Sequence, residues 1–315
     1  LRLAGNHKSD AGNPYSSDLN GDGISELLFA NTEADGVIYW GQGTPTNPNW
    51  STSHATSLGA NNYPSMLNVA DLNGDGYPEI LVGSQGSASF IYWGQPGGAY
   101  TVQYNPSART SLPPGWTISA SDINHDGRPE LFIGGTIYWG RAGGVYGVQY
   151  SGSSITTLSD GILSLADLNS DGRPEILSAS TYQPVIIHWA QVGGAYGVQY
   201  NDTARTVFAG NVREYYAIIG ADLNNDGLAD IVSATCCGFG QINFDSHIYW
   251  GQLGGTYGIT YSQVNSTSLP TVAAYNASIV NIDNDAYLDI VFQGCCVSPQ
   301  VRVFRGPFPT SGTAS

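Results

Sequence analysis

Positive charge is scarce in this chain. It contains 10 Lys and Arg residues against 25 Asp and Glu, so the formal net charge at pH 7 is −15. A protein that binds nucleic acid needs a basic surface for the phosphates, and an anionic membrane surface would also repel this chain. The charge balance therefore argues against nucleic acid and against anionic membranes as partners.

A long apolar run is absent as well. No stretch approaches the roughly 20 apolar residues of a membrane-spanning helix, and the N-terminus does not have the pattern of a signal peptide. Because the chain begins at Leu1 rather than Met, we expect a mature secreted protein or an excised domain. We expect no membrane insertion.

The motifs of several common enzyme classes are also missing. The sequence has no Gly-x-Ser-x-Gly, no His-Glu-x-x-His and no phosphate-binding loop. No two of its five histidines have a catalytic spacing: His7, His54, His125, His188 and His247. A lyase needs a base and a charge-neutralising group that converge in a cleft, and no pattern directs such groups to one point. We therefore expect no enzymatic activity.

The most prominent feature present is an acidic nine-residue loop that occurs six times. The copies begin at residues 18, 71, 122, 167, 222 and 281 and carry oxygen-bearing side chains at positions 1, 3, 5 and 9. Five of them have Gly at position 6, and the six together contain 18 of the 25 acidic residues. Ca²⁺ takes six to eight oxygen ligands, and glycine permits the sharp turn between them. The pattern predicts six calcium-binding loops.

The predicted metal ligands are the side chains at positions 1, 3, 5 and 9, and with a backbone carbonyl at position 7 they nearly fill the coordination sphere. We therefore expect a structural rather than a catalytic metal. Six Ca²⁺ ions would offset most of the net charge, and millimolar extracellular calcium suits such loops, so we expect a secreted protein. The ligands are Asp18, Asn20, Asp22, Glu26, Asp71, Asn73, Asp75, Glu79, Asp122, Asn124, Asp126, Glu130, Asp167, Asn169, Asp171, Glu175, Asp222, Asn224, Asp226, Asp230, Asn281, Asp283, Asp285 and Asp289.

Each loop lies within a repeat of four short strand-like segments. An apolar segment precedes the loop, a second follows it, a third ends in Tyr-Trp-Gly, and the fourth resembles 100–104 and 146–150. Short β-branched and aromatic runs bounded by Gly, Pro and Asn indicate strands joined by hairpins. Four strands per repeat of about 50 residues predict one blade of a β-propeller.

Six loops predict an all-β, six-bladed β-propeller of four-stranded antiparallel blades that forms a single domain, 1–315. The last repeat lacks a fourth segment before the polar C-terminal tail at 307–315. We expect the N-terminal strand at Leu1–Leu3 to complete that blade and close the ring, which removes an exposed edge. The alternative is an unpaired N-terminus.

The loop Asp-x-Asn-x-Asp-Gly-x-x-Glu/Asp within a propeller blade resembles the FG-GAP or VCBS repeat of integrin α-like propellers. A soluble chain with a single propeller is similar to the secreted mushroom lectins of the Psathyrella velutina type, which bind N-acetylglucosamine. The resemblance covers nearly the whole chain and implies Ca²⁺ in the loops. It also implies a carbohydrate or protein ligand, although related repeats occur in polysaccharide lyases and adhesion proteins and a fold does not define a function.

The sixth loop departs from the pattern. It has Asn281 at position 1, Asp283 at position 3 and Ala286 in place of Gly. A left-handed backbone at position 6 would be costly for alanine. We expect a weaker or empty sixth site.

Two pairs of adjacent cysteines follow the second segments of the fifth and sixth repeats. Equivalent points of neighbouring blades should be too far apart for a disulfide. We therefore expect the vicinal disulfides Cys236–Cys237 and Cys295–Cys296 in an oxidising compartment. Each strained ring either offers an apolar platform for a sugar or stiffens its loop.

Aromatic residues also precede the acidic loops, on the side of each blade opposite the metal. Sugars stack on aromatic rings, and repeated sites would give avidity. The candidate carbohydrate-binding residues, which could equally be packing anchors, are Tyr63, Trp116, Tyr215, Tyr216 and Tyr275, together with Cys236, Cys237, Cys295 and Cys296.

A second aromatic repeat contains a tryptophan at one position of five repeats. We expect these rings to fill the core between blades, with a sugar pocket lined by Gln42, Gln95, Gln191 and Gln252 as the alternative. The five are Trp40, Trp93, Trp139, Trp189 and Trp250.

Together these features predict a calcium-stabilised, multivalent carbohydrate-binding protein that recognises glycans or glycoproteins. The N-acetylglucosamine specificity is implied only by the resemblance. The alternatives are a polysaccharide lyase and an integrin-like module that binds protein.

Overall fold

The structure is a computed structural model that describes residues 15–29, 36–59, 64–84, 86–115, 117–158, 162–178, 184–208, 215–235, 245–294, 300–310 and 312–313. These residues form β-strands and two single-turn 3₁₀ helices, η1 (Thr52–His54) and η2 (Pro106–Ala108), with no α-helix among them. No helix in this part of the chain is long and apolar enough to cross a membrane. The chain divides into two compact units, residues 1–157 and 158–315.

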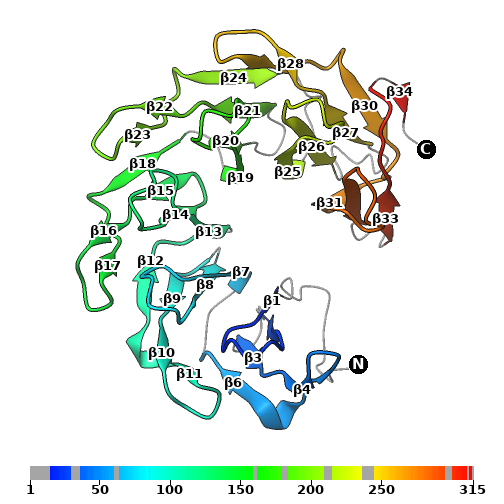
Figure 1. The fold of residues 1–315 in the computed structure, drawn as a ribbon. Coiled ribbons are helices and arrows are strands. Elements are labelled where there is room, and N and C mark those ends of the chain that lie inside the picture. The colour runs from blue at the N-terminus through cyan, green and yellow to red at the C-terminus, as the bar shows by residue number, and fades with distance from the viewer. Residues whose placement is uncertain are drawn as a thin grey trace. The chain divides into compact units, whose positions relative to one another are not determined.

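The first unit contains three four-stranded antiparallel sheets, here called blades one to three (Figure 1). Strand order in each sheet follows the chain, and the first strands of consecutive blades lie side by side. Blade one comprises β1 (Tyr15–Ser17), β2 (Glu26–Phe29), β3 (Val37–Tyr39) and β6 (Ala55–Ser57). Blade two comprises β7 (Pro64–Ala70), β8 (Glu79–Ser84), β9 (Ser89–Tyr92) and β12 (Thr110–Leu112). Blade three comprises β13 (Ile118–Ser121), β14 (Glu130–Ile133), β15 (Thr136–Tyr138) and β18 (Ile155–Thr157).

The second unit repeats this plan in blades four to six. Blade four comprises β19 (Ile162–Ala166), β20 (Glu175–Ser178), β21 (Val185–His188) and β24 (Arg205–Phe208). Blade five comprises β25 (Tyr215–Ala221), β26 (Asp230–Thr235), β27 (Ser246–Tyr249) and β30 (Ser266–Leu269). Blade six has three strands among the described residues, β31 (Ala274–Val280), β32 (Asp289–Gly294) and β33 (Val301–Phe304).

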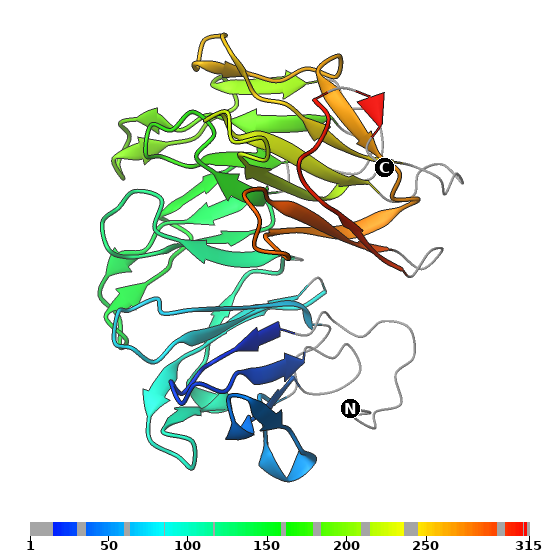
Figure 2. The same ribbon diagram turned by 45° about the vertical axis from the view of Figure 1, so that its right-hand side comes forward.

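After β33 the chain returns to blade five, as Figure 2 shows. Strand β34 (Gly312–Thr313) pairs in parallel with β30, and Phe308 is buried in the core between blades five and six. The segment predicted to be a polar tail therefore includes a core residue and a fifth strand for blade five.

The prediction of an all-β, six-bladed propeller with antiparallel blades is confirmed. The N-terminal segment Leu1–Leu3, predicted to complete the last blade, lies outside the described residues. That the chain forms one domain stays a prediction.

The fourth strands were assigned wrongly from the sequence. Segments such as 100–104 belong to two-stranded hairpins inserted between the third and fourth strands, and the true fourth strands are short Thr- and Ser-containing segments that follow them. The hairpins are β4 (Gln42–Thr44) with β5 (Asn47–Asn49), β10 (Gly94–Pro96) with β11 (Val102–Tyr104), β16 (Arg141–Ala142) with β17 (Val148–Gln149), β22 (Gln191–Val192) with β23 (Val198–Gln199), and β28 (Gln252–Leu253) with β29 (Ile259–Thr260).

The repeated tryptophans lie in the core, as predicted. All five are at most 4% exposed, and each indole Nε1 donates to a threonine hydroxyl of the fourth strand of its blade at 2.8–3.0 Å. A tyrosine from the hairpin of the next blade stacks on the ring, with centroid distances of 4.4 Å for Trp40–Tyr100, 4.3 Å for Trp93–Tyr146 and 4.5 Å for Trp189–Tyr257. The hairpins therefore couple neighbouring blades, and the tyrosine covers the ring face that a sugar would need.

Candidate metal centre

Each acidic loop connects the first two strands of its blade. The residue before position 1 pairs with the residue at position 9 in all six blades, as in Ala70↔Glu79 of blade two and Ala166↔Glu175 of blade four. This pairing holds the two ends of every loop together, because antiparallel partners lie about 5 Å apart. The nine residues therefore form a closed turn at one end of the blade.

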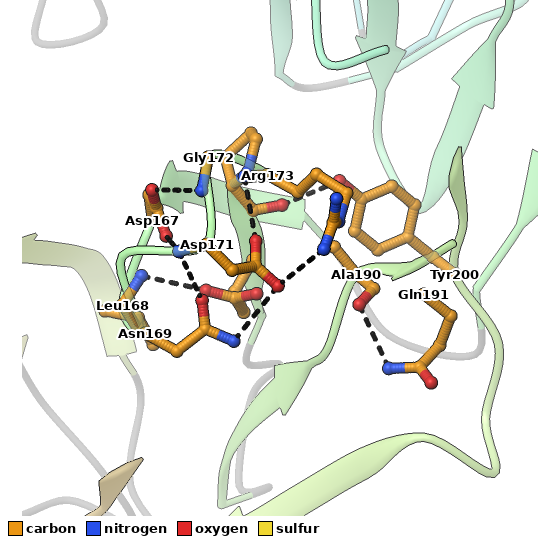
Figure 3. Close-up of polar contacts among 11 residues, drawn as sticks. Asp167, Leu168, Asn169, Asp171, Gly172, Arg173, Ala190, Gln191 and Tyr200 are labelled. Carbon is orange, nitrogen blue, oxygen red and sulfur yellow. Dashed lines mark hydrogen bonds and ion pairs between the residues drawn. The ribbon is translucent and has the colours of Figure 1, made fainter. Parts of the chain in front are cut away.

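The fourth loop, shown in Figure 3, illustrates how the side chains are held. Asp167 accepts hydrogen bonds from the amide of Asp171 at 3.1 Å and from the amide of Gly172 at 2.9 Å. Asn169 Oδ1 also accepts from the amide of Asp171, at 3.1 Å. Asp167 and Asn169 thus fold the loop around their own oxygens, as Asp and Asn do in turns.

Loops one to five repeat these contacts with little variation. The amide at position 6 donates to Oδ2 of the aspartate at position 1 at 2.9–3.0 Å in each of them. The amide at position 2 donates to the carboxylate at position 9 at 2.6–3.0 Å in all six loops. The side chains predicted as ligands therefore occupy equivalent places in five loops.

The glycine at position 6 is required by the backbone. Its φ lies between +83° and +86° in loops one to five, the region that favours glycine. A Cβ at Gly76 or Gly227 would meet no atom within 4 Å, so the requirement is conformational rather than steric.

The carboxylates at position 9 are buried without a positive partner. Glu79, Glu130 and Glu175 are 0% exposed, and their Oε1 atoms have no hydrogen-bond partner. A backbone amide, that of Gly94, Gly140 or Ala190 respectively, interacts weakly with each of these carboxyl groups and lowers its pKa. Such an uncompensated buried acid is costly unless a cation approaches it.

Burial raises the pKa of these carboxyl groups, and the neighbouring aspartates of the loop add to the effect. The pKa rises to about 8 for Glu79 and Glu130, about 7 for Glu26 and Glu175, and about 6 for Asp230. The loops are therefore sites where added positive charge would be stabilising.

An aromatic residue of the hairpin holds the backbone beside position 9, a contact that sequence reasoning missed. The hydroxyl of Tyr104 donates to the carbonyl of Pro78 at 2.9 Å, and Trp50 Nε1 donates to the equivalent carbonyl of Ser25 at 3.0 Å. Three further hairpin tyrosines make the same contact: Tyr150, Tyr200 and Tyr261. The second tyrosine of the repeated Tyr-x-x-x-Tyr was the available signal.

The acidic loop and the hairpin lie at the same end of each blade. Besides the tyrosine contacts, the amide of Gly251, next to hairpin strand β28, donates to Asp230 Oδ1 at 2.9 Å. The loop therefore shares its side of the blade with the connection between the third and fourth strands.

The donor chemistry of loops one to five fits Ca²⁺. Each offers three carboxylates and an amide oxygen within nine residues, the hard oxygen ligands that this ion prefers. In three of them the buried Oε1 atom also lacks a partner. Within the described ranges, however, no three His, Cys, Asp or Glu side chains are already grouped as a metal site, since the aspartates face the loop amides.

The sixth loop does not fit. Asn281 donates Nδ2 to the carbonyl of Asp285 at 2.7 Å, Ala286 has no positive φ, and Arg305 pairs with Asp283 at 3.2 Å. The contacts at its positions 3, 5 and 9 are kept: Asp283 accepts from the amide of Asp285 at 3.3 Å, Asp285 accepts from the amide of Tyr287 at 2.7 Å, and Asp289 accepts from the amide of Ile282 at 2.8 Å.

Most candidate carbohydrate-binding residues cannot be placed. Tyr63, Trp116 and all four cysteines, with both expected disulfides, lie outside the described residues. For Tyr215, Tyr216 and Tyr275 the structure describes the backbone alone, in β25 and β31.

A β-bulge at the start of the first strand is common to four blades. Tyr215 pairs with Thr235 and Ala217 with Ala234, so Tyr216 is the extra residue. Tyr275 is the extra residue of β31 in the same way. The extra residues of β7 and β19 are Ser65 and Leu163. The bulges lie at the opposite end of the strand from the acidic loop.

Among the similar solved structures, one supports the fold and nothing beyond it. A protein from Lactobacillus plantarum shares 10% identity with this chain at a TM-score of 0.51, with 90% of this chain and 82% of that chain covered. BBS1N in complex with ARL6DN shares 11% identity at a TM-score of 0.39, covering 91% and 90%. The V. cholerae biofilm matrix protein Bap1 shares 17% identity at a TM-score of 0.41, covering 94% of this chain and 50% of that chain.

No curated protein matches the chain. The FG-GAP-like repeat family, in contrast, matches residues 18–82, 71–133 and 167–233. Each matched range begins at position 1 of an acidic loop. These ranges cover more than half of the sequence, and the protein therefore belongs to the FG-GAP-like repeat family.

Proposed function

We propose that this protein is a calcium-stabilised, multivalent carbohydrate-binding protein that acts outside the cell and has no enzymatic activity. The proposal has two parts, a structural role for Ca²⁺ in the acidic loops and a ligand face at the other end of the blades. Each part has its own support and its own test.

The calcium part is supported by the five equivalent loops. Bound Ca²⁺ would supply the positive charge that the clustered carboxylates lack. Loops one to five would hold it through the side chains at positions 1, 3, 5 and 9, and the buried Oε1 atoms of Glu79, Glu130 and Glu175 make no hydrogen bond of normal geometry among the described residues. Each of these loops is tied to the hairpin of its own blade by an aromatic side chain. The hairpins of blades two, three and five stack on the tryptophan of the preceding blade, so loading these loops would also stabilise the connection to that blade.

The observation that carries the carbohydrate part is the repeated bulge. It occurs near the start of the first strand in blades two, four, five and six, and the extra residue precedes the acidic loop by six residues in blades two, five and six and by four in blade four. In two of these blades the extra residue is a tyrosine, Tyr216 or Tyr275. Bulges change the direction of a strand locally and are over-represented beside functional sites. An aromatic residue at such a place is suited to stacking on a sugar.

Repetition of the bulge would give several similar weak sites on one protein. Weak sites gain strongly in combined affinity when one multivalent glycan occupies several of them. Glycans or glycoproteins with repeated terminal sugars are therefore the expected partners, and N-acetylglucosamine is the first sugar to test.

A glycan array with the full chain in Ca²⁺ and in EGTA, read together with thermal melting, tests the proposal. We expect glycan binding in Ca²⁺, and in EGTA a lower melting temperature with loss of binding only where the protein has unfolded. Loss of binding without a change in melting would place the metal in the ligand site and contradict a structural role. Binding to proteins but to no glycan would indicate an adhesion module, and an unsaturated sugar product would indicate a lyase.

Paired variants test the ligand face. Tyr216→Ala and Tyr275→Ala should each weaken glycan binding several-fold while leaving the calcium-dependent melting shift intact. Gln199→Ala, on an exposed hairpin strand at the other end of blade four, is the matched control and should bind normally. Equal binding by all three variants would refute the assignment of the face.

A further inference from the structure

The sixth acidic loop has the same place in its blade as the other five. Val280 pairs with Asp289 across its ends, and the amide of Ile282 donates to Asp289 Oδ2 at 2.8 Å. Asp283 and Asp285 also accept from the amides of Asp285 and Tyr287, as their counterparts do. Two features of the sixth loop differ: the side chain at position 1, and contacts that reach the loop from outside it.

The first difference is at position 1. In loops one to five an aspartate there accepts a hydrogen bond from the position-6 glycine amide. Asn281 instead donates its Nδ2 group to the carbonyl of Asp285 at 2.7 Å, and Ala286 does not adopt the positive φ of the glycines. An N–H donor cannot coordinate a cation, so this corner of the loop is closed by a hydrogen bond within the protein.

The second difference is that two groups from outside reach the loop. Asn225, at position 4 of the fifth loop, donates Nδ2 to the carbonyl of Ala286 at 2.8 Å. Arg305, which follows β33, places Nη1 3.2 Å from Asp283 Oδ2. The guanidinium neutralises the carboxylate that replaces the usual Asn at position 3, and Asn225 ties the sixth loop to the fifth.

We propose that the sixth loop is a metal-independent turn in which Asn281, Asn225 and Arg305 together replace Ca²⁺, so that the full chain binds five ions. The inference rests on the proposed calcium binding by the other loops. The Arg305–Asp283 pair is half exposed and contributes little alone, so the closed corner at Asn281 is the main obstacle to an ion. One oxygen, Asn281 Oδ1, is buried without a hydrogen-bond partner and is the atom that a sixth ion would use.

Counting bound Ca²⁺ on the full chain by native mass spectrometry tests this inference with a matched pair of variants. Asp226 and Asp285 both occupy position 5, in loops five and six. We expect five ions on the unmodified protein, four on Asp226→Asn and still five on Asp285→Asn. Six ions on the unmodified protein and five on Asp285→Asn would overturn the inference and leave the proposed function intact. No bound ion on any of them would refute the calcium proposal itself.

A gain-of-site variant tests whether these residues are what excludes an ion from the sixth loop. Combining Asn281→Asp, Ala286→Gly and Arg305→Gln restores the pattern of the other loops and removes the guanidinium, and we expect it to bind six ions. A count that stays at five in this folded variant would show that these residues do not exclude the ion. Circular dichroism and the melting curve in Ca²⁺ check that it is folded.

Discussion

Glu79→Gln should change the stability of this protein in opposite directions with and without calcium. The side chain is fully buried at position 9 of the second loop, its Oε1 atom has no hydrogen-bond partner, and burial raises its pKa to about 8. Glutamine has nearly the same shape and can still accept the hydrogen bond that Leu72 donates. The substitution therefore removes the charge and keeps the packing.

Without metal, the carboxyl group must take up a proton when the chain folds at pH 7. The ordinary pKa is 4.5 and the folded value is about 8, so at pH 7 the cost is about 3 kcal/mol, at 1.36 kcal/mol per pH unit. Glutamine avoids this cost but leaves an amide partly unsatisfied, which takes back about 1 kcal/mol. We expect Glu79→Gln to raise the free energy of unfolding in EGTA by about 1–2 kcal/mol.

With saturating calcium the sign should reverse. An ion bound at a hundred times its Kd contributes about 2.7 kcal/mol, and loss of a carboxylate ligand removes much of this. Urea unfolding at pH 7, followed by tryptophan fluorescence in Ca²⁺ and in EGTA, measures both values. Asp202→Asn, which lies outside the acidic loops, is the control, and it should change the free energy of unfolding by the same amount in Ca²⁺ and in EGTA. If Glu79→Gln changed the free energy of unfolding in the same direction in Ca²⁺ and in EGTA, the idea that a cation binds this carboxylate would be refuted.

The same group contributes to the pH dependence of stability in EGTA, together with the other position-9 carboxyl groups whose pKa is raised. A carboxyl group whose pKa is raised on folding favours the folded state when protonated, so its contribution is fully present below about pH 4.5 and is lost as the pH rises to about 8. Unmodified protein in EGTA should lose stability across this window, and Glu79→Gln should lose less.

Three further substitutions probe the frame that supports the loops, each measured by urea unfolding. Tyr146→Ala removes the ring stacked on Trp93 and should cost about 3 kcal/mol, whereas a cost below 1 kcal/mol would mean that the stack does not couple the blades. Tyr104→Phe removes only the hydrogen bond to Pro78 and should cost about 1 kcal/mol; a neutral result would show that this contact does not support the loop. Gly227→Ala forces a positive φ on alanine without a steric clash and should cost about 1–2 kcal/mol. The stabilisation by Ca²⁺ should also become smaller in this variant. An unchanged stabilisation by Ca²⁺ would argue against a fixed turn at this glycine.

Predictions based on local pattern were the successful ones. Six copies of one loop defined six blades, and the second strand of every blade begins at position 9 of its loop, where the predicted apolar segment begins. The burial of the tryptophans also followed, because a large ring that recurs on every blade has to lie where the blades pack. These properties depend on a few neighbouring residues and on their repetition.

The fourth strand could not be assigned correctly from pattern. Val102 and Tyr104 look more strand-like than Thr110 and Leu112, yet the former pair belongs to the hairpin and the latter to the blade. Which of the two segments joins the blade as its fourth strand depends on the indole of Trp93, which donates to the hydroxyl of Thr110. A hydrogen bond between residues 17 positions apart leaves no mark in a local pattern.

The sequence by itself determined the fold class, the number of blades and the location of the acidic loops, because these follow from short-range pattern and its repetition. Only the tertiary structure showed that hairpin aromatics anchor the loops and that Asn225 and Arg305 reach the sixth loop from elsewhere in the chain. Such contacts join residues distant in sequence, and they depend on how strands and loops are brought together in space. The loops are thus a property of the sequence, whereas the contacts that reach each loop from distant residues are decided by the fold.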